Sequence, residues 1–104
     1  MRYSVEITEP AQLNIQEAYD WLHAESATAA VEWIDGLLET IEKLGTFPLR
    51  CPLAPESTDH KEKIRQIFYH SYRLLFVVRK TKVYMLHVRH SSRNRARSEE
   101  VFPQ

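Results

Sequence analysis

The 104-residue sequence contains one cysteine, two glycines and no long apolar run. Because Cys51 has no second cysteine to pair with, an intramolecular disulfide is excluded, and no Cys/His spacing resembles a zinc site. We expect Cys51 to be a packed or loop thiol, and we expect no metal or other cofactor. No segment approaches the ~20 apolar residues of a membrane helix, and the stretch MRYSVEITEP lacks the apolar core of a secretory signal. We therefore expect a single domain, residues 1–104, in the cytoplasm and without a membrane partner.

The net charge is zero, but the two signs are divided along the chain. Residues 1–60 contain 3 Lys and Arg against 11 Asp and Glu, whereas residues 61–104 contain 11 against 3. A basic segment of this kind suits a surface that binds phosphate or carboxylate groups. The alternative is a solvated basic face that is neutralised by the acidic helices of the same molecule.

Apolar residues at helical spacing predict two helices in the first half of the chain. The first covers about residues 10–24 and has Pro10 in its first turn, where proline is tolerated. The second is capped by Ser26 and ends at Gly45, which we expect to adopt the left-handed conformation before Pro48. Since one or two residues separate the helices, they must form an antiparallel hairpin.

The remaining segments predict strands and one long connection. Residues 2–8 alternate between polar and apolar side chains, which indicates a half-buried strand. Residues 48–61 contain three prolines and no periodicity, and three β-rich segments follow at 63–69, 71–79 and 82–90. The fold class is therefore α+β: an antiparallel β-sheet with an N-terminal strand and an α-helical hairpin packed on one face, in the order β-α-α-β-β-β.

The last two strands form a hairpin whose turn sets the register. The only polar break between them is centred on residues 80–81, so Arg79 should lie opposite Lys82. Continued regularly, this pairing places Arg73 opposite Val88.

The same register assigns side chains to the two faces of the sheet. Ser71 would lie opposite His90, so Arg73, His90 and Tyr84 would project from one face as parts of an open surface. The other face is more continuously apolar, and we expect the helical hairpin to cover it. Its residues are Tyr72, Leu74, Phe76, Val78, Val83, Met85 and His87, the last as a core histidine.

An arginine beside a histidine on a basic surface suits RNA phosphodiester cleavage without a metal. The imidazole can transfer a proton near neutral pH, and the guanidinium can hold the non-bridging phosphate oxygens. Tyr84 or Tyr69 could stack on a base. Two alternatives stay open: Arg73 pairs only with a nearby acid or an acidic partner peptide, and the tyrosines belong to the core.

The order of elements, together with the segments FPLRCPLAPE, IRQIFYHSYRLLFVV and VYMLHVRHSSR, resembles the RelE/ParE family of toxins from bacterial type II toxin–antitoxin systems, some of which stabilise plasmids. The resemblance covers nearly the whole chain. It implies an antitoxin, encoded nearby, with an acidic C-terminal segment that wraps the toxin. RelE-like members cleave mRNA in the ribosomal A site, whereas ParE-like members inhibit DNA gyrase without cutting RNA.

Within this resemblance, Arg73 matches the strand arginine that contacts the scissile phosphate, and His90 matches a histidine that transfers protons. Two departures concern the lysines of the preceding strand, where Ile64, Gln66 and Phe68 face Arg73, and a C-terminal tyrosine, where this chain has Phe102. The resemblance favours a ribosome-dependent mRNA endoribonuclease; the alternatives are a gyrase inhibitor and a non-toxic module that binds the antitoxin. The predicted catalytic residues are Arg73, His90 and Arg65, and the predicted RNA-binding residues are Arg89, Arg93, Arg95, Lys63 and Tyr84.

Overall fold

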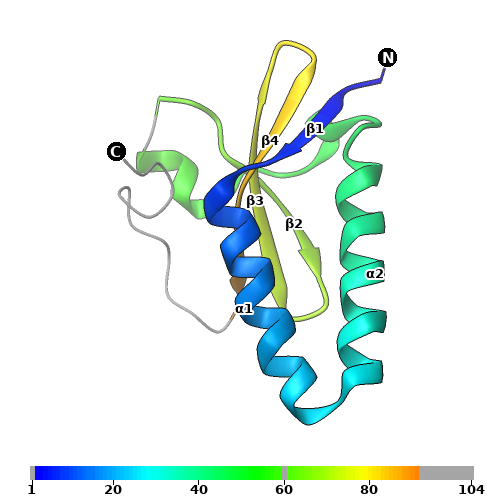
Figure 1. Ribbon diagram of the computed structural model, residues 1–104. Helices are drawn as coiled ribbons and strands as arrows, with labels where there is room; N and C mark the ends of the chain where they lie inside the picture. The colour runs from blue at the N-terminus through cyan, green and yellow to red at the C-terminus, as the bar shows by residue number, and fades with distance from the viewer. Residues whose placement is uncertain (1, 60, 92–104) are drawn as a thin grey trace.

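The computed structural model describes residues 2–59 and 61–91. Its elements are β1 (Ser4–Ile7), α1 (Glu9–Glu25), α2 (Ala27–Lys43), the 3-10 helices η1 (Pro48–Arg50) and η2 (Pro55–Asp59), β2 (Arg65–Tyr69), β3 (Tyr72–Arg79) and β4 (Lys82–His90). They form a four-stranded sheet in the order β1-β4-β3-β2. The predicted α+β architecture is confirmed (Figure 1), and β1 joins the three antiparallel strands as a parallel neighbour of β4.

Ser26 is the only residue between the two helices, and it caps the second one as predicted. Its side-chain oxygen accepts a hydrogen bond from the Ala29 backbone N–H at 3.2 Å, which satisfies one of the unpaired donors in the first helical turn. The helices then run side by side (Figure 1). Their apolar residues pack against those of the sheet in one core cluster. The buried residues of the helices are Ala11, Ile15 and Ala18 on α1 and Ala30, Trp33, Leu37 and Ile41 on α2.

The end of α2 differs from the prediction. The helix stops close to Gly45, but no described glycine has a positive φ, so the left-handed cap predicted for Gly45 is wrong. Gly45 is required there for another reason: a Cβ would lie 2.9 Å from the Tyr3 carbonyl oxygen, and the Gly45 carbonyl accepts a hydrogen bond from the Tyr3 N–H at 2.7 Å. The left-handed residue is Phe47, with φ of 53°, immediately before Pro48. The lack of a side chain at Gly45 therefore allows its backbone to approach that of Tyr3 closely.

The face of the sheet predicted to be open is in fact covered. The connection between α2 and β2, including η2, packs on it, and in Figure 1 the sheet stands between α2 and η2. Ala54 and Ile64 from this connection bury a second apolar cluster together with three residues of the sheet, Leu75, Val77 and Leu86. The sequence did not predict this layer, because a covering segment without regular structure has no hydrophobic period that would indicate its buried face.

A β-bulge changes the register of the β3–β4 hairpin. From the turn as far as the pair Phe76–Met85 the pairing follows the prediction, including Arg79 opposite Lys82. The register then shifts between Leu75 and Phe76, and Leu86 is the extra residue on β4. Beyond the bulge, Arg73 lies opposite Arg89 and His90 lies opposite Tyr72, so the predicted pairs Arg73–Val88 and Ser71–His90 are wrong.

Candidate functional site

Arg73 is buried beneath η2, on the face of the sheet away from the helices. Its two terminal nitrogens donate to the two carboxylate oxygens of Glu56, at 3.0 Å and 2.7 Å, and Nη1 also donates to the side-chain oxygen of Gln66 at 3.1 Å. The Arg73 side chain is 10% exposed and that of Glu56 is 0% exposed. Such a two-pronged contact is the strongest arrangement for an arginine and a carboxylate. The structure thus agrees with the alternative that Arg73 pairs with a nearby acid.

Glu56 also offsets an unfavourable pairing within the sheet. Arg73 and Arg89 lie directly opposite each other on β3 and β4, and like charges in that position repel. The buried carboxylate neutralises the Arg73 guanidinium and so removes most of this cost. Glu56 was not predicted as a site residue, because the sequence around an acid in an irregular segment does not indicate which cation it will pair with. The available signal was its place as the lone acid between Pro48 and Thr58, in the segment that had to lie somewhere over the sheet.

His90 lies on the opposite side of the sheet, beside the helices. Its ring meets the ring of Tyr72 edge to face, with centroids 5.2 Å apart. Tyr72 in turn packs against the helix-covered core, whereas Arg73, its neighbour in the chain, points to the other face. The prediction that Arg73 and His90 share a face is therefore wrong, because the bulge shifts β4 by one residue relative to β3. Their catalytic roles stay predictions.

The other predicted site residues are also dispersed. Arg65 donates from Nη1 to the Cys51 carbonyl at 2.7 Å, and its strand partner is Phe76, a residue of the helix-covered core. Tyr84 lies opposite Val77, four residues along β3 from Arg73 and so about 13 Å away. Lys63 is exposed just before β2, and Arg89 lines the cavity described below. Arg93 and Arg95 lie outside the described residues.

Acidic partners neutralise two basic residues at the turn of the β3–β4 hairpin. Arg79 donates from Nε to Glu62 at 2.8 Å, and Lys82 contacts Glu6 at 2.9 Å. The hydrogen bonds to Glu62 raise the pKa of Arg79, and those to Glu6 raise the pKa of Lys82. Both cations also lie over the Tyr84 ring, at 5.1 Å and 5.3 Å from its centroid. This part of the basic segment is a solvated face paired with acids of the same molecule.

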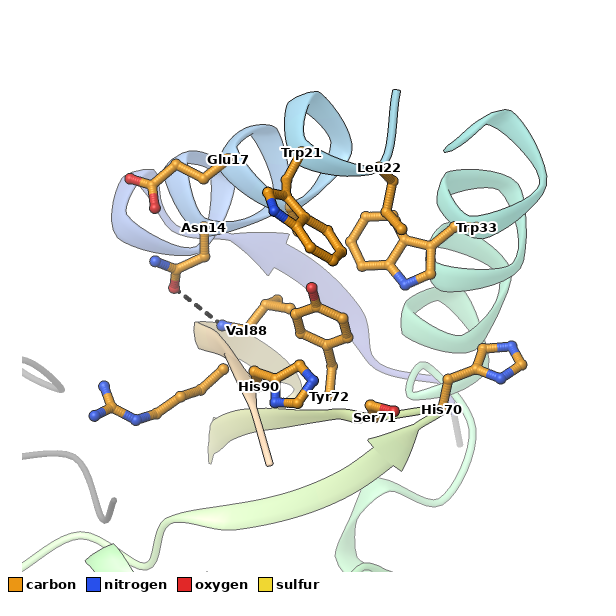
Figure 2. A pocket seen from close by; sticks show the side chains of 12 residues that line it. Asn14, Glu17, Trp21, Leu22, Trp33, His70, Ser71, Tyr72, Val88 and His90 are labelled. Carbon is orange, nitrogen blue, oxygen red and sulfur yellow. Dashed lines mark hydrogen bonds between the residues drawn. The ribbon is translucent and has the colours of Figure 1, made fainter. Parts of the chain in front are cut away.

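A cavity of about 630 Å³ opens between α1, α2 and the ends of β3 and β4. Figure 2 shows Trp21, Trp33, Tyr72 and His90 projecting toward it from four different elements. Trp21 is 63% exposed, whereas Trp33 is 9% exposed. The full lining consists of Asn14, Glu17, Ala18, Trp21, Leu22, Trp33, His70, Ser71, Tyr72, Val88, Arg89 and His90.

Trp33 is held in the cavity wall by β2 and β3. The Tyr69 hydroxyl donates to the Trp33 carbonyl at 2.8 Å, and burial, assisted by the charges of Asp35 and Glu39, raises the pKa of that hydroxyl, which keeps it a donor. The contact requires Gly36, since a Cβ at this position would lie 2.2 Å from the Tyr69 oxygen. The Trp33 ring also meets Tyr72 edge to face at 5.3 Å. Trp33 is not among the residues predicted from the sequence, although its position continues the apolar stripe of α2.

Asn14 fixes the rim of the cavity by joining α1 to β4. Its side-chain oxygen accepts a hydrogen bond from the Val88 backbone N–H at 3.1 Å (Figure 2) and lies 2.9 Å from His87 Nδ1. Because that oxygen must accept from the backbone, His87 Nδ1 is the protonated nitrogen of the contact. His87 is buried, which confirms its predicted place in the core.

Within residues 2–59 and 61–91 no group of His, Cys, Asp and Glu could hold a metal ion. In the same part of the chain no helix combines the length and the apolar character that crossing a membrane needs. The described residues form two distinct constellations: the buried Arg73–Glu56 pair under η2 and the aromatic cavity beside the helices.

Comparisons with known proteins agree with this fold. A solved structure described as a chromosomal ParDE toxin–antitoxin system from P. aeruginosa superposes with a TM-score of 0.72 over 86% of this chain and 96% of that chain, at 14% sequence identity. No curated protein sequence matches the chain. The family model for the ParE toxin of the type II toxin–antitoxin system parDE matches residues 5–95. The chain therefore belongs to the ParE toxin family of type II toxin–antitoxin systems.

Proposed function

We propose that this toxin inhibits DNA gyrase by binding it, without catalysis. The observation that carries the proposal is the separation of Arg73 from His90: the guanidinium is bound by Glu56 under η2, and the imidazole lies on the other side of the sheet. Cleavage of an RNA phosphodiester would need a proton-transfer group and a phosphate-binding cation at the same phosphate. The two residues that the family resemblance offers for those roles cannot meet there in this arrangement.

The energetics of the Arg73–Glu56 pair support the same conclusion. For Arg73 to contact a phosphate, Glu56 would have to leave, and separating one member of a buried ion pair costs about 3–5 kcal/mol. A phosphate would have to supply at least that much binding free energy before it stabilised a transition state. Inhibition by surface contact makes no such demand, and the match to the ParE family model over residues 5–95 favours it.

A ribosome-dependent mRNA endoribonuclease is the second candidate function. One observation bears on it: Arg89 and His90 are consecutive on β4 and both line the cavity, although their side chains point to opposite faces of the sheet and neither Arg73 nor Arg65 is with them. In this version His90 would transfer the proton and Arg89 would hold the phosphate.

A ParDE-type system includes an antitoxin, and we propose that the antitoxin of this chain is acidic and that both act in the cytoplasm. The support is the excess of basic residues in positions 61–104, where 11 Lys and Arg stand against 3 Asp and Glu.

The decisive experiment combines two assays on the same preparation. Purified toxin is added to gyrase in a supercoiling assay, and the toxin gene is induced in cells whose mRNA 5′ ends are then mapped. We expect inhibition of supercoiling and no new mRNA ends, with His90→Gln as active as the parent. New ends at codon boundaries that vanish in His90→Gln and Arg89→Ala, together with normal gyrase activity, would reject the proposal in favour of the nuclease. A chain that binds its antitoxin but harms neither target would be the non-toxic module.

A further inference from the structure

The aromatic cavity between the helices and the sheet has three large rings around one space. Trp21 comes from α1, Trp33 from α2 and Tyr72 from β3, and Figure 2 shows the three rings grouped together. Trp21 is 63% exposed at the mouth, whereas Trp33 is 9% exposed and belongs to the inner wall. The faces of indole and phenol rings carry negative charge in their π systems, so they attract a cation.

Glu17 adds a full negative charge to the same cavity. It lines the cavity and lies four residues before Trp21 on α1, a spacing that makes two side chains neighbours on one helix face. Glu17 is exposed, and no described residue forms an ion pair with it. A carboxylate beside an indole can hold a cation from two sides, one through charge and the other through the ring face.

The charges around the cavity favour a cation over an anion. Together α1 and α2 contain eight Asp and Glu against one Lys, so the helical wall lies in a negative potential. Arg89 lines the cavity, but its side chain projects from the other face of the sheet, because successive residues of a strand alternate and His90 lies on the helix side. The Arg89 guanidinium therefore does not offset the charge of Glu17 at the cavity.

We propose that this cavity binds the guanidinium group of an arginine side chain of a partner protein, stacked on the Trp21 indole and paired with the Glu17 carboxylate. A guanidinium is planar, stacks on aromatic faces and is more weakly hydrated than the ammonium of lysine. A side chain within a polypeptide fits better than free arginine, whose own carboxylate would be repelled by Glu17. A volume of about 630 Å³ has room for this long side chain. The inference does not depend on the target of the toxin, because binding alone tests it.

The test follows the two indole N–H signals of the ¹⁵N-labelled full-length chain, which the variant Trp21→Phe assigns because it retains only that of Trp33. The probes are the Nα-acetyl amides of arginine and of citrulline, which has nearly the same shape as arginine but no charge. We expect the arginine probe to shift the Trp21 signal in a saturable manner and the citrulline probe to bind at least about tenfold more weakly. Equal binding of the two probes, or no saturable shift up to about 20 mM of the arginine probe, would overturn the proposal.

Variants separate the contact at the mouth from the general field of the helices. Trp21→Ala, followed on the Trp33 signal, should weaken binding of the arginine probe about fivefold, and the fold should survive because the side chain is exposed. Glu17→Gln should also weaken it about fivefold. The matched control is Glu25→Gln, the same chemical change at an exposed position of α1 outside the cavity lining, where binding should stay within about twofold. Equal losses in Glu17→Gln and Glu25→Gln, or full binding by Trp21→Ala, would contradict the site.

Two further probes test the identity of the occupant. Free arginine should bind at least about threefold more weakly than the Nα-acetyl amide, because its carboxylate approaches Glu17. If free arginine bound as tightly, the cavity would be a site for the amino acid, and the assignment to a partner protein would be wrong. The Nα-acetyl amide of phenylalanine should bind more weakly than the arginine probe, and the opposite order would show that the cavity selects an apolar side chain and would overturn the proposal.

Discussion

The two faces of the sheet are covered in different ways. On one face, α1 and α2 bury an apolar cluster that includes Leu74, Phe76, Val83 and Met85. On the other, the irregular connection with η2 buries a smaller apolar cluster around Leu75 and encloses the ion pair between Arg73 and Glu56. The helical layer satisfies its own backbone hydrogen bonds, whereas the irregular layer is attached to the sheet through the Arg73–Glu56 pair and through backbone bonds such as that from the Gln66 N–H to the Pro52 carbonyl at 3.0 Å.

This difference shows how the chain can retain Arg73, the arginine that matches the family pattern, while burying it in an ion pair. The helical layer is held mainly by apolar contacts, with added hydrogen bonds at Asn14 and Tyr69. In the irregular layer the guanidinium at position 73 binds a buried carboxylate and so helps to hold this segment on the sheet. An arginine at this strand position can therefore contribute to folding, apart from the phosphate contact that the family resemblance implies for it.

The largest expected effect is on the irregular layer. Glu56→Gln would leave the Arg73 guanidinium buried without a counter-charge, and we expect the free energy of unfolding to fall by about 3–5 kcal/mol. Urea denaturation followed by circular dichroism measures this. The double variant Glu56→Leu/Arg73→Met should regain most of the lost stability, since it removes both charges together. A loss below about 1 kcal/mol in Glu56→Gln would mean that the pair does not secure η2 to the sheet.

A matched pair of neighbours on β3 compares the apolar parts of the two faces. Leu74 and Leu75 are both fully buried, one under the helices and one under the irregular connection. We expect Leu74→Ala to cost about 4 kcal/mol and Leu75→Ala about 2–3 kcal/mol, because an irregular segment can settle into a cavity more readily than two packed helices. Equal losses, measured by urea denaturation of both variants, would show that the two layers are equally rigid.

The smallest effect is expected at the turn of the β3–β4 hairpin. Glu62 pairs there with Arg79, and both side chains are substantially exposed. Glu62→Gln should change the free energy of unfolding by less than about 1 kcal/mol, and added salt should reduce even that difference. Since Glu62→Gln and Glu56→Gln make the same chemical change, their comparison isolates the effect of burial. A large, salt-independent loss in Glu62→Gln would contradict this account.

Periodicity predicted the regular elements well because each has a repeat that is visible in the sequence. Ser26 as the N-cap, the turn at residues 80–81 and the apolar face of β3 all followed from local patterns. The arrangement of the candidate site did not follow from local patterns, for two reasons. One extra residue at Leu86 moved His90 to the helix side, and a bulge of this kind has no local signature. Glu56 and Arg73 are 17 residues apart in the sequence, and Glu56 belongs to a segment without a hydrophobic period that would predict its position.

Gly36 is needed where α2 contacts β2. The hydroxyl oxygen of Tyr69 lies where the first carbon of any side chain at position 36 would have to be. Adding a single methyl group there would force the Tyr69 hydroxyl aside and break its hydrogen bond to the Trp33 carbonyl. This attachment of α2 to β2 thus depends on an atom that the chain omits.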